Sequence, residues 1–193
     1  MGWTGSKSMH CITFDDFIAL SEPKEEYYAG RWAYFQEVIK MVGEIAPRSV
    51  LELGPALFTV VKNADIMRKP EPDVWGAPSN VKSIEYLHDA TVTPWPVHKK
   101  YDLFIALQVF EHLTGSQARA FQEVKRIARY AILSLPYKWD CPVDDANYPE
   151  HHMIDENTIL GWTKGEAPQK WVYIERTGIK VSKGERIIGL WEF

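Results

Sequence analysis

The segment Tyr101 to Leu107 reads YDLFIAL and is almost entirely apolar after its Asp102. Strands that are buried on both faces of a parallel sheet have this composition. A helical stripe of apolar residues follows between Ser116 and Arg129, and a second apolar run from Ala131 to Leu135 ends before Pro136. The order strand, helix, strand predicts a parallel sheet with crossover helices.

The residues before this unit continue the same alternation. A long amphipathic helix after Ser21 is expected to end between Gly43 and Pro47, because Trp32, Phe35, Ile39 and Val42 recur on one face. Ser49 to Leu53 then reads as a strand that Gly54 and Pro55 stop. Val60-Val61 or Asp65 to Met67 can supply a short second strand, and Val81 to Leu87 a third.

The residues after Pro136 predict a different ending. Tyr137 to Pro149 reads as a polar loop, and Glu156 to Trp162 as a helix. Trp171 to Glu175 and Arg186 to Trp191 read as a terminal antiparallel β-hairpin. We expect one domain overall, in which residues 1–47 form a helical extension packed on an α/β domain of residues 48–193.

Composition narrows the class of partner. The chain has 193 residues, a formal net charge of −4 and no Lys/Arg-rich block, which disfavours binding to nucleic acid. Its two cysteines lack CxxC spacing, so that no disulfide framework or zinc ribbon is indicated. No apolar run reaches the ~20 residues that a membrane span needs. We therefore expect a cytoplasmic monomer or homodimer that acts on a small molecule, without a membrane or nucleic-acid partner.

The ligand site is expected at one edge of the sheet. Open parallel sheets bind ligands outside the carboxyl ends of their strands. These ends are Leu53, Leu87, Leu107 and Leu135 in the predicted strands. The turns that follow them should carry the chemistry.

Three of these turns resemble one family. Val50-Leu51-Glu52-Leu53-Gly54-Pro55 resembles the first motif of class I S-adenosylmethionine-dependent methyltransferases, in particular the type 11-like group, where an acid and a glycine turn hold the amino-acid end of the cofactor. His88-Asp89-Ala90-Thr91 resembles the turn that meets the adenine, and Gln108 to Leu113 is similar to the turn after the fourth strand. The resemblance implies a Rossmann-like fold, mostly parallel, with helices on both faces and the terminal hairpin. It implies that S-adenosylmethionine contacts Glu52, Gly54, Pro55, Asp65, Asp89, Ala90 and Gln108.

The resemblance also implies methyl transfer to an oxygen or nitrogen atom of a small molecule. The candidate catalytic residues are His112, His151 and His152, because a histidine beside the acceptor can take the proton of a hydroxyl nucleophile. His151 and His152, with Glu150 and Asp155 nearby, can also be read as metal ligands. Adjacent side chains seldom converge on one ion, and no third spaced ligand follows, so no metal is expected.

A second hypothesis is a methyltransferase-fold protein without activity that serves as a binding or scaffold subunit. Ala56 and Phe58 stand where the family usually has glycine, and Arg68 stands near the position of an acid that holds the ribose. A nicotinamide-dependent oxidoreductase is disfavoured because no GxGxxG turn is present, and an α/β-hydrolase because no GxSxG elbow is present.

Overall fold

A computed structural model describes residues 10–70, 78–81, 84–140, 149–175 and 185–193. Its strands are β1 (His10–Cys11), β2 (Val50–Leu53), β3 (Val61–Lys62), β4 (Asp65–Arg68), β5 (Tyr86–Leu87), β6 (Tyr101–Leu107), β7 (Ala128–Tyr137), β8 (Lys170–Glu175) and β9 (Glu185–Glu192). Its α-helices are α1 (Phe14–Ser21), α2 (Glu25–Tyr28), α3 (Trp32–Ile45), α4 (Gln117–Ile127) and α5 (Glu156–Trp162). Short 3-10 helices are η1 (Glu22–Lys24), η2 (Phe110–His112) and η3 (Pro149–His151).

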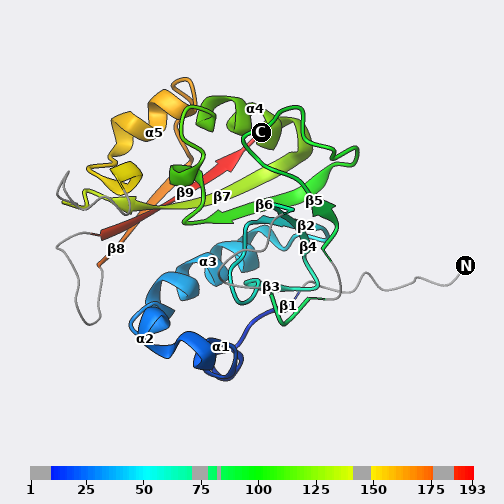
Figure 1. The fold of residues 1–193 in the computed structure, drawn as a ribbon, viewed down its shortest axis with the longest axis vertical. Coiled ribbons are helices and arrows are strands. Elements are labelled where there is room, and N and C mark those ends of the chain that lie inside the picture. Colours follow the sequence, from blue (N-terminus) through cyan, green and yellow to red (C-terminus); the bar gives the residue numbers. More distant parts are fainter. Residues whose placement is uncertain (1–9, 71–77, 82–83, 141–148, 176–184) are drawn as a thin grey trace, which may run out of the picture.

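A seven-stranded sheet in the order β5-β4-β2-β6-β7-β9-β8 forms the centre of the molecule. Five neighbouring strands are mutually parallel, namely β5, β4, β2, β6 and β7, and β9 pairs antiparallel with both β7 and β8. Helix α3 lies on one face of this sheet, and α4 and α5 lie on the other (Figure 1). The predicted fold class, a mostly parallel Rossmann-like sheet with a terminal antiparallel hairpin and helices on both faces, is confirmed.

The alternation along β6 explains why both faces are covered. Leu103 and Ile105 pack on the α3 side, whereas Phe104 and Ala106 pack on the side of α4 and α5. All four side chains are fully buried. Helix α3 ends where Ala46 adopts a left-handed conformation, inside the predicted range. No helix in the described part of the chain is long and apolar enough to cross a membrane.

Strand β7 is longer than the sequence predicted at both ends. It begins at Ala128, so the expected helix stops at Ile127 rather than at Arg129. It also continues through Pro136 to Tyr137, pairing with β9. Its pairing with β6 has already ended at Ser134, so only β9 borders this part of β7. A proline is tolerated at such an edge because fewer backbone donors are needed there.

The N-terminal helix and the third predicted strand are corrected as well. The long helix is interrupted between α2 and α3, where Gly30 has a positive φ of 73°. Helix α1, capped by Thr13, was not expected. The strand predicted from Val81 to Leu87 pairs over Tyr86 and Leu87 alone, within the described residues, because it is an edge strand beside the short β4. Leu87 is accordingly 61% exposed.

The connection from β2 to β4 contains no helix, and all of its residues are described. Both candidate strands in this region form: β4 joins the main sheet, and β3 pairs antiparallel with β1. The segment from residue 54 to residue 60 therefore runs as a loop beside the carboxyl end of β2. This loop forms one wall of the candidate site.

Candidate functional site

The carboxyl ends of β2 and β6 carry two residues with left-handed backbones. Gly54 follows β2 with a φ of 59°, and Gln108 follows β6 with a φ of 57°. The Gly54 amide donates to the carbonyl of Met67, and the Gln108 amide donates to the carbonyl of Ser134. A Cβ atom at Gly54 would stand 3.3 Å from Cγ2 of Val109. The two turns are thus in contact, and the glycine is needed for both its conformation and its size.

Glu52 lies beneath the loop that follows Gly54. Its side chain is 2% exposed, and its Oε2 accepts a hydrogen bond of 3.1 Å from the amide of Val60. Burial raises the pKa of Glu52 to about 8, and the amides of Val60 and Val61 offset only part of this rise. A buried acid with a pKa near neutrality responds strongly to any positive charge placed beside it.

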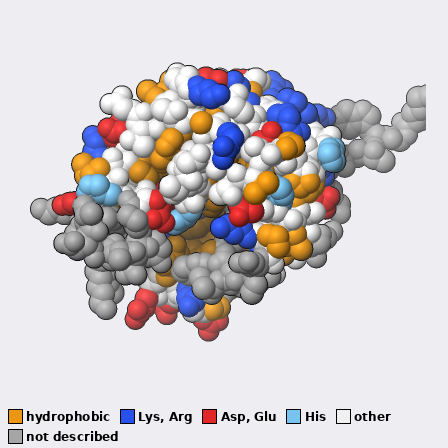
Figure 2. Space-filling model, turned by 45° about the horizontal axis from the view of Figure 1, so that its top comes forward, with side chains coloured by type: hydrophobic (Ala, Val, Ile, Leu, Met, Phe, Trp, Pro, Cys, Tyr) orange, Lys and Arg blue, Asp and Glu red, His pale blue; other side chains and the backbone are white. Residues whose placement is uncertain are grey.

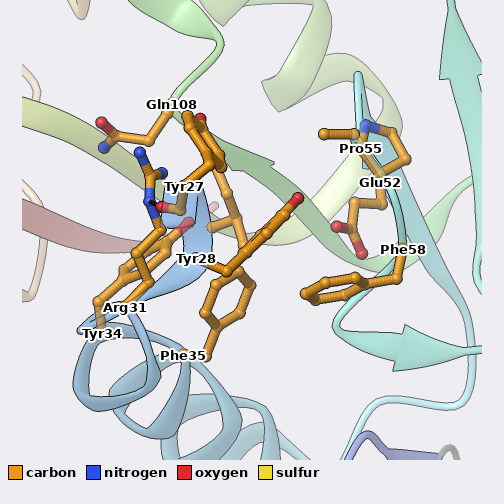
Figure 3. Close-up of a pocket in the computed structure, with 11 residues that line it drawn as sticks. Tyr27, Tyr28, Arg31, Tyr34, Phe35, Glu52, Pro55, Phe58 and Gln108 are labelled. Atoms are coloured by element: carbon orange, nitrogen blue, oxygen red, sulfur yellow. Dashed lines mark hydrogen bonds between the residues drawn. The ribbon is translucent and has the colours of Figure 1, made fainter. Parts of the chain in front are cut away.

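A pocket opens between these turns and the N-terminal helices. Figure 3 shows Arg31 and Gln108 on one side of it and Glu52, Pro55 and Phe58 on the other. The Tyr28 ring lies between them with its hydroxyl pointing toward the turn after β2 (Figure 3). The complete lining is Tyr27, Tyr28, Arg31, Tyr34, Phe35, Glu52, Pro55, Ala56, Phe58, Leu107 and Gln108.

The pocket is small in this conformation. It encloses about 50 Å³, whereas sites for small molecules usually have several hundred. Arg31 occupies part of the space, since its Nε donates to the Tyr27 carbonyl at 2.6 Å and its guanidinium stacks 3.6 Å above the Tyr27 ring. Tyr27 lies in α2, and Arg31 immediately precedes α3. A ligand larger than a few atoms must displace them.

The predicted adenine turn lies after β5. Oδ1 of Asp89 accepts from the amide and the hydroxyl of Thr91, and Oδ2 lies 4.0 Å from Nζ of Lys69. The Thr91 amide is the main reason why the pKa of Asp89 is lowered. Ala90 is buried, and its carbonyl accepts from the indole of Trp95. Asp89 is therefore a fixed, ionised acceptor at the carboxyl edge.

Asp65 is not brought together with the other candidates. It begins β4, and so lies at the amino edge of the sheet, where its Oδ2 accepts from the Tyr101 hydroxyl at 2.6 Å and pairs with Lys99. The carboxyl end of β4 carries Arg68 instead. Glu71 and Asp73, the other acids near this position, lie outside the described residues. The structure thus separates Asp65 from the turns to which the sequence had assigned it.

Two of the three candidate histidines form a cluster. His112 ends η2, and its Nδ1 is 2.9 Å from Oε1 of Glu150. Nε2 of His151, which ends η3, is 3.4 Å from Nε2 of His112. His152 lies apart from this contact: it is exposed and forms an isolated β-bridge with Trp139. Figure 2 shows one face of the molecule, where histidine, acidic and basic side chains lie around a hollow with an apolar floor.

Sequence reasoning missed several residues of this edge. Tyr27, Tyr28 and Arg31 line the pocket, but nothing in their local pattern distinguishes them from the exposed face of a helix. Glu111 was seen only as part of a motif, yet it is 1% exposed, and burial raises its pKa to about 8. Its burial is a consequence of tertiary packing.

Comparison with known proteins finds similarity of structure but none of sequence family. No family model and no curated protein matches the sequence. Among solved structures, the N-methyltransferase NodS from Bradyrhizobium japonicum is similar over 85% of this chain and 96% of its own, with a TM-score of 0.59 and 11% identity. A S-adenosylmethionine-dependent methyltransferase from Clostridium acetobutylicum is similar over 93% and 98%, with a TM-score of 0.54 and 10% identity.

A third solved structure adds a ligand to the comparison. The N-terminal domain of EvdMO1, solved in the presence of SAH and D-fucose, is similar over 82% of each chain, with a TM-score of 0.53 and 12% identity. At these identities the likeness establishes the fold. The chain therefore has the fold of class I S-adenosylmethionine-dependent methyltransferases.

Proposed function

We propose that this chain binds S-adenosylmethionine at the carboxyl edge of its sheet and transfers the methyl group to an oxygen or nitrogen atom of a small molecule. The observation that carries the proposal is the pair of left-handed turns at Gly54 and Gln108 beside the buried Glu52. These turns open onto one pocket, at the edge where open α/β sheets bind ligands.

The pocket residues fit the amino-acid end of this cofactor. Its ammonium group would be held near Glu52, and the positive charge would stabilise the ionised form of that carboxyl. Its carboxylate would be held by Arg31, because a guanidinium offers paired donors to a carboxylate. Arg31 leaves its stacked position on Tyr27 in this arrangement, which provides the volume that the pocket lacks.

The other end of the cofactor would lie toward Asp89. Oδ1 of Asp89 is engaged by Thr91, and Oδ2 is the atom that an exocyclic amine would meet. Lys69 competes for that oxygen only weakly, since the pair is 4.0 Å apart and exposed to solvent. The adenine would then cover the turn at Ala90.

S-adenosylmethionine supplies the electrophilic methyl group, and the chain's own residues position the acceptor in line with it. Holding two reactants in a near-attack geometry contributes much of the rate enhancement of a bimolecular transfer. The acceptor would lie near η2 and η3, which carry the histidine cluster. We propose a small-molecule acceptor because the cluster carries both acids and bases rather than a cationic surface.

Two observations favour the alternative, an inactive protein of this fold. Arg68 ends β4 where the family has an acid, and Phe58 packs at 5.1 Å from Tyr28 where the family has a glycine. Such a protein would retain the sheet and lose the cofactor. Cofactor binding therefore separates the two functions.

Calorimetric titration with S-adenosylhomocysteine tests the proposal in three proteins. Asp89→Asn retains Oδ1 for Thr91 but replaces Oδ2 by a donor, so we expect binding to weaken at least tenfold. Asp65→Asn, at the opposite edge, is the matched control and should bind like the wild type. Equal weakening in both variants contradicts the assigned site, and no saturable binding to the folded wild type favours the inactive alternative.

A further inference from the structure

Three side chains that could hold a metal ion converge beside the carboxyl edge. Glu111 and His112 belong to η2, and His151 belongs to η3, 39 residues after His112. One ligand atom from each of the three lies within 4.8 Å of the others. The convergence arises because η2 follows β6 and η3 packs against it.

The spacing of the two imidazole rings matches that of two metal ligands. Nε2 of His112 and Nε2 of His151 are 3.4 Å apart. Two nitrogen atoms that bind one tetrahedral zinc ion at about 2.0–2.1 Å are separated by about 3.3–3.4 Å. The rings face each other through the atoms that would bind the ion.

The third group, Glu111, is a buried acid without a hydrogen bond to its carboxylate in the described part of the chain. It is 1% exposed, and neither of its carboxylate oxygens has a hydrogen-bond partner among the described residues. Buried polar atoms without a partner are rare, because leaving one unpaired forfeits the hydrogen bonds that water would have made to it. A cation between Glu111 and the two imidazoles would provide the missing contact.

Glu150 prepares His112 for this role. Oε1 of Glu150 lies 2.9 Å from Nδ1 of His112, and a carboxylate there accepts only from a proton on Nδ1, which in a neutral ring leaves the lone pair on Nε2 for an ion. Carboxylates that accept from the distal nitrogen of a metal-binding histidine orient the ring in the same way. Glu150 is thus a positioning residue for the site.

We propose that Glu111, His112 and His151 form a site for a divalent transition-metal cation, represented by Zn²⁺. Two imidazoles and one carboxylate favour such ions over Mg²⁺ and Ca²⁺, which prefer oxygen ligands alone. Three protein ligands leave a coordination position for water or for an oxygen of another molecule. The proposal rests on this geometry and does not depend on methyl transfer.

The inference revises two expectations from the sequence. The sequence suggested His151 and His152 as metal ligands, and we expected no metal because a third spaced ligand was missing. In the structure His151 lies with Glu111 and His112 instead, and His152 lies outside this group. An imidazole whose Nε2 binds a cation is also not a proton acceptor. His112 and His151 are therefore metal ligands in this account, rather than general bases.

The test uses the full chain without an affinity tag, freed of metal by a chelator and dialysed. Zn²⁺ is titrated in competition with a chromophoric chelator, and Co²⁺ is titrated with detection of its visible absorption. We expect one ion per chain, with the intense Co²⁺ bands of a four-coordinate site, and at least tenfold weaker binding of Mg²⁺. His112→Ala and His151→Ala should each weaken Zn²⁺ binding at least a hundredfold, and Glu150→Gln at least tenfold.

His152→Ala is the matched control, because it removes the neighbouring imidazole and leaves the cluster intact. It should retain wild-type affinity and the Co²⁺ spectrum. Circular dichroism verifies that each variant is folded, and the exposure of His112 makes its removal the mildest of the ligand changes. Absence of stoichiometric Zn²⁺ binding, or equal affinities in His151→Ala and His152→Ala, would overturn the proposal.

Discussion

Replacing Glu52 by glutamine should change how the stability of the protein depends on pH. The folded state raises the pKa of this carboxyl from 4.5 to about 8, mainly through burial. Between these values the unfolded chain has lost the proton and the folded chain has kept it. Because the unfolded state binds fewer protons, the free energy of unfolding of the wild type falls as pH rises through this window.

The magnitude follows from the size of the window. One ionisable group changes the free energy of unfolding by at most about 1.4 kcal/mol per pH unit. Over the roughly three units from about pH 5 to about pH 8, Glu52 therefore destabilises the wild type by up to about 4 kcal/mol. Glutamine keeps an oxygen for the Val60 amide and does not ionise. Glu52→Gln should gain this amount relative to the wild type.

Urea unfolding followed by tryptophan fluorescence at several pH values measures the difference between the two proteins. Subtracting the two curves isolates Glu52, because every other titrating group is shared. We expect the difference to grow steadily in favour of the variant from about pH 5 to about pH 8. A difference that stays constant across this range would refute the assignment of Glu52 as a buried, protonated acid.

Three further predictions concern the same edge and the terminal hairpin. As pH rises toward about 8, the affinity for S-adenosylmethionine measured by calorimetry should increase by up to about tenfold per pH unit, because a cationic ligand beside Glu52 favours the ionised form of this carboxyl. Glu52→Gln should abolish this pH dependence. Gly54→Ala should lower the free energy of unfolding in urea by about 1–2 kcal/mol because the alanine must adopt a left-handed backbone, and its Cβ should add a close contact with Val109. The second change Val109→Ala should relieve only this contact, so full recovery of stability in the double variant would contradict the backbone effect. Gly189→Ala should lower the melting temperature and the free energy of unfolding, the latter by about 1–3 kcal/mol, because its Cβ would stand 2.4 Å from the Trp191 ring. Gly161→Ala is the control: its Cβ meets open space in a helix, so it should stabilise the protein by roughly 1 kcal/mol. Equal effects of the two changes would contradict the packing argument.

The central strands were predictable because their local sequence is a run of apolar residues, as expected for buried strands. Tyr101 to Leu107 is apolar on both faces, and the structure buries Leu103 and Phe104 on opposite sides of the sheet. The amphipathic helix and the terminal hairpin follow from periodicity in the same way. The ends of elements were less certain: Pro136 lies inside β7 because only β9 borders it there, a fact of tertiary pairing.

The candidate site was only partly visible in the sequence. Gly54 and Asp89 stand in local motifs and occupy the expected edge, although their roles remain predictions. Asp65 was assigned to the cofactor by the family resemblance, as a substitute for an acid expected near Arg68, and the register of β4 places it at the opposite edge. The contact of His151 with His112 spans 39 residues, and neither local pattern specifies that approach.

The location of cofactor binding is tested most directly by NMR, with backbone amide spectra of the labelled protein recorded during titration with S-adenosylhomocysteine. We expect saturable shifts at Gly54, Ala90 and Gln108, at the carboxyl ends of β2, β5 and β6, and none at Asp65 or Lys99 at the amino edge. Shifts confined to the amino edge, or no saturable shifts at millimolar ligand, would contradict the account.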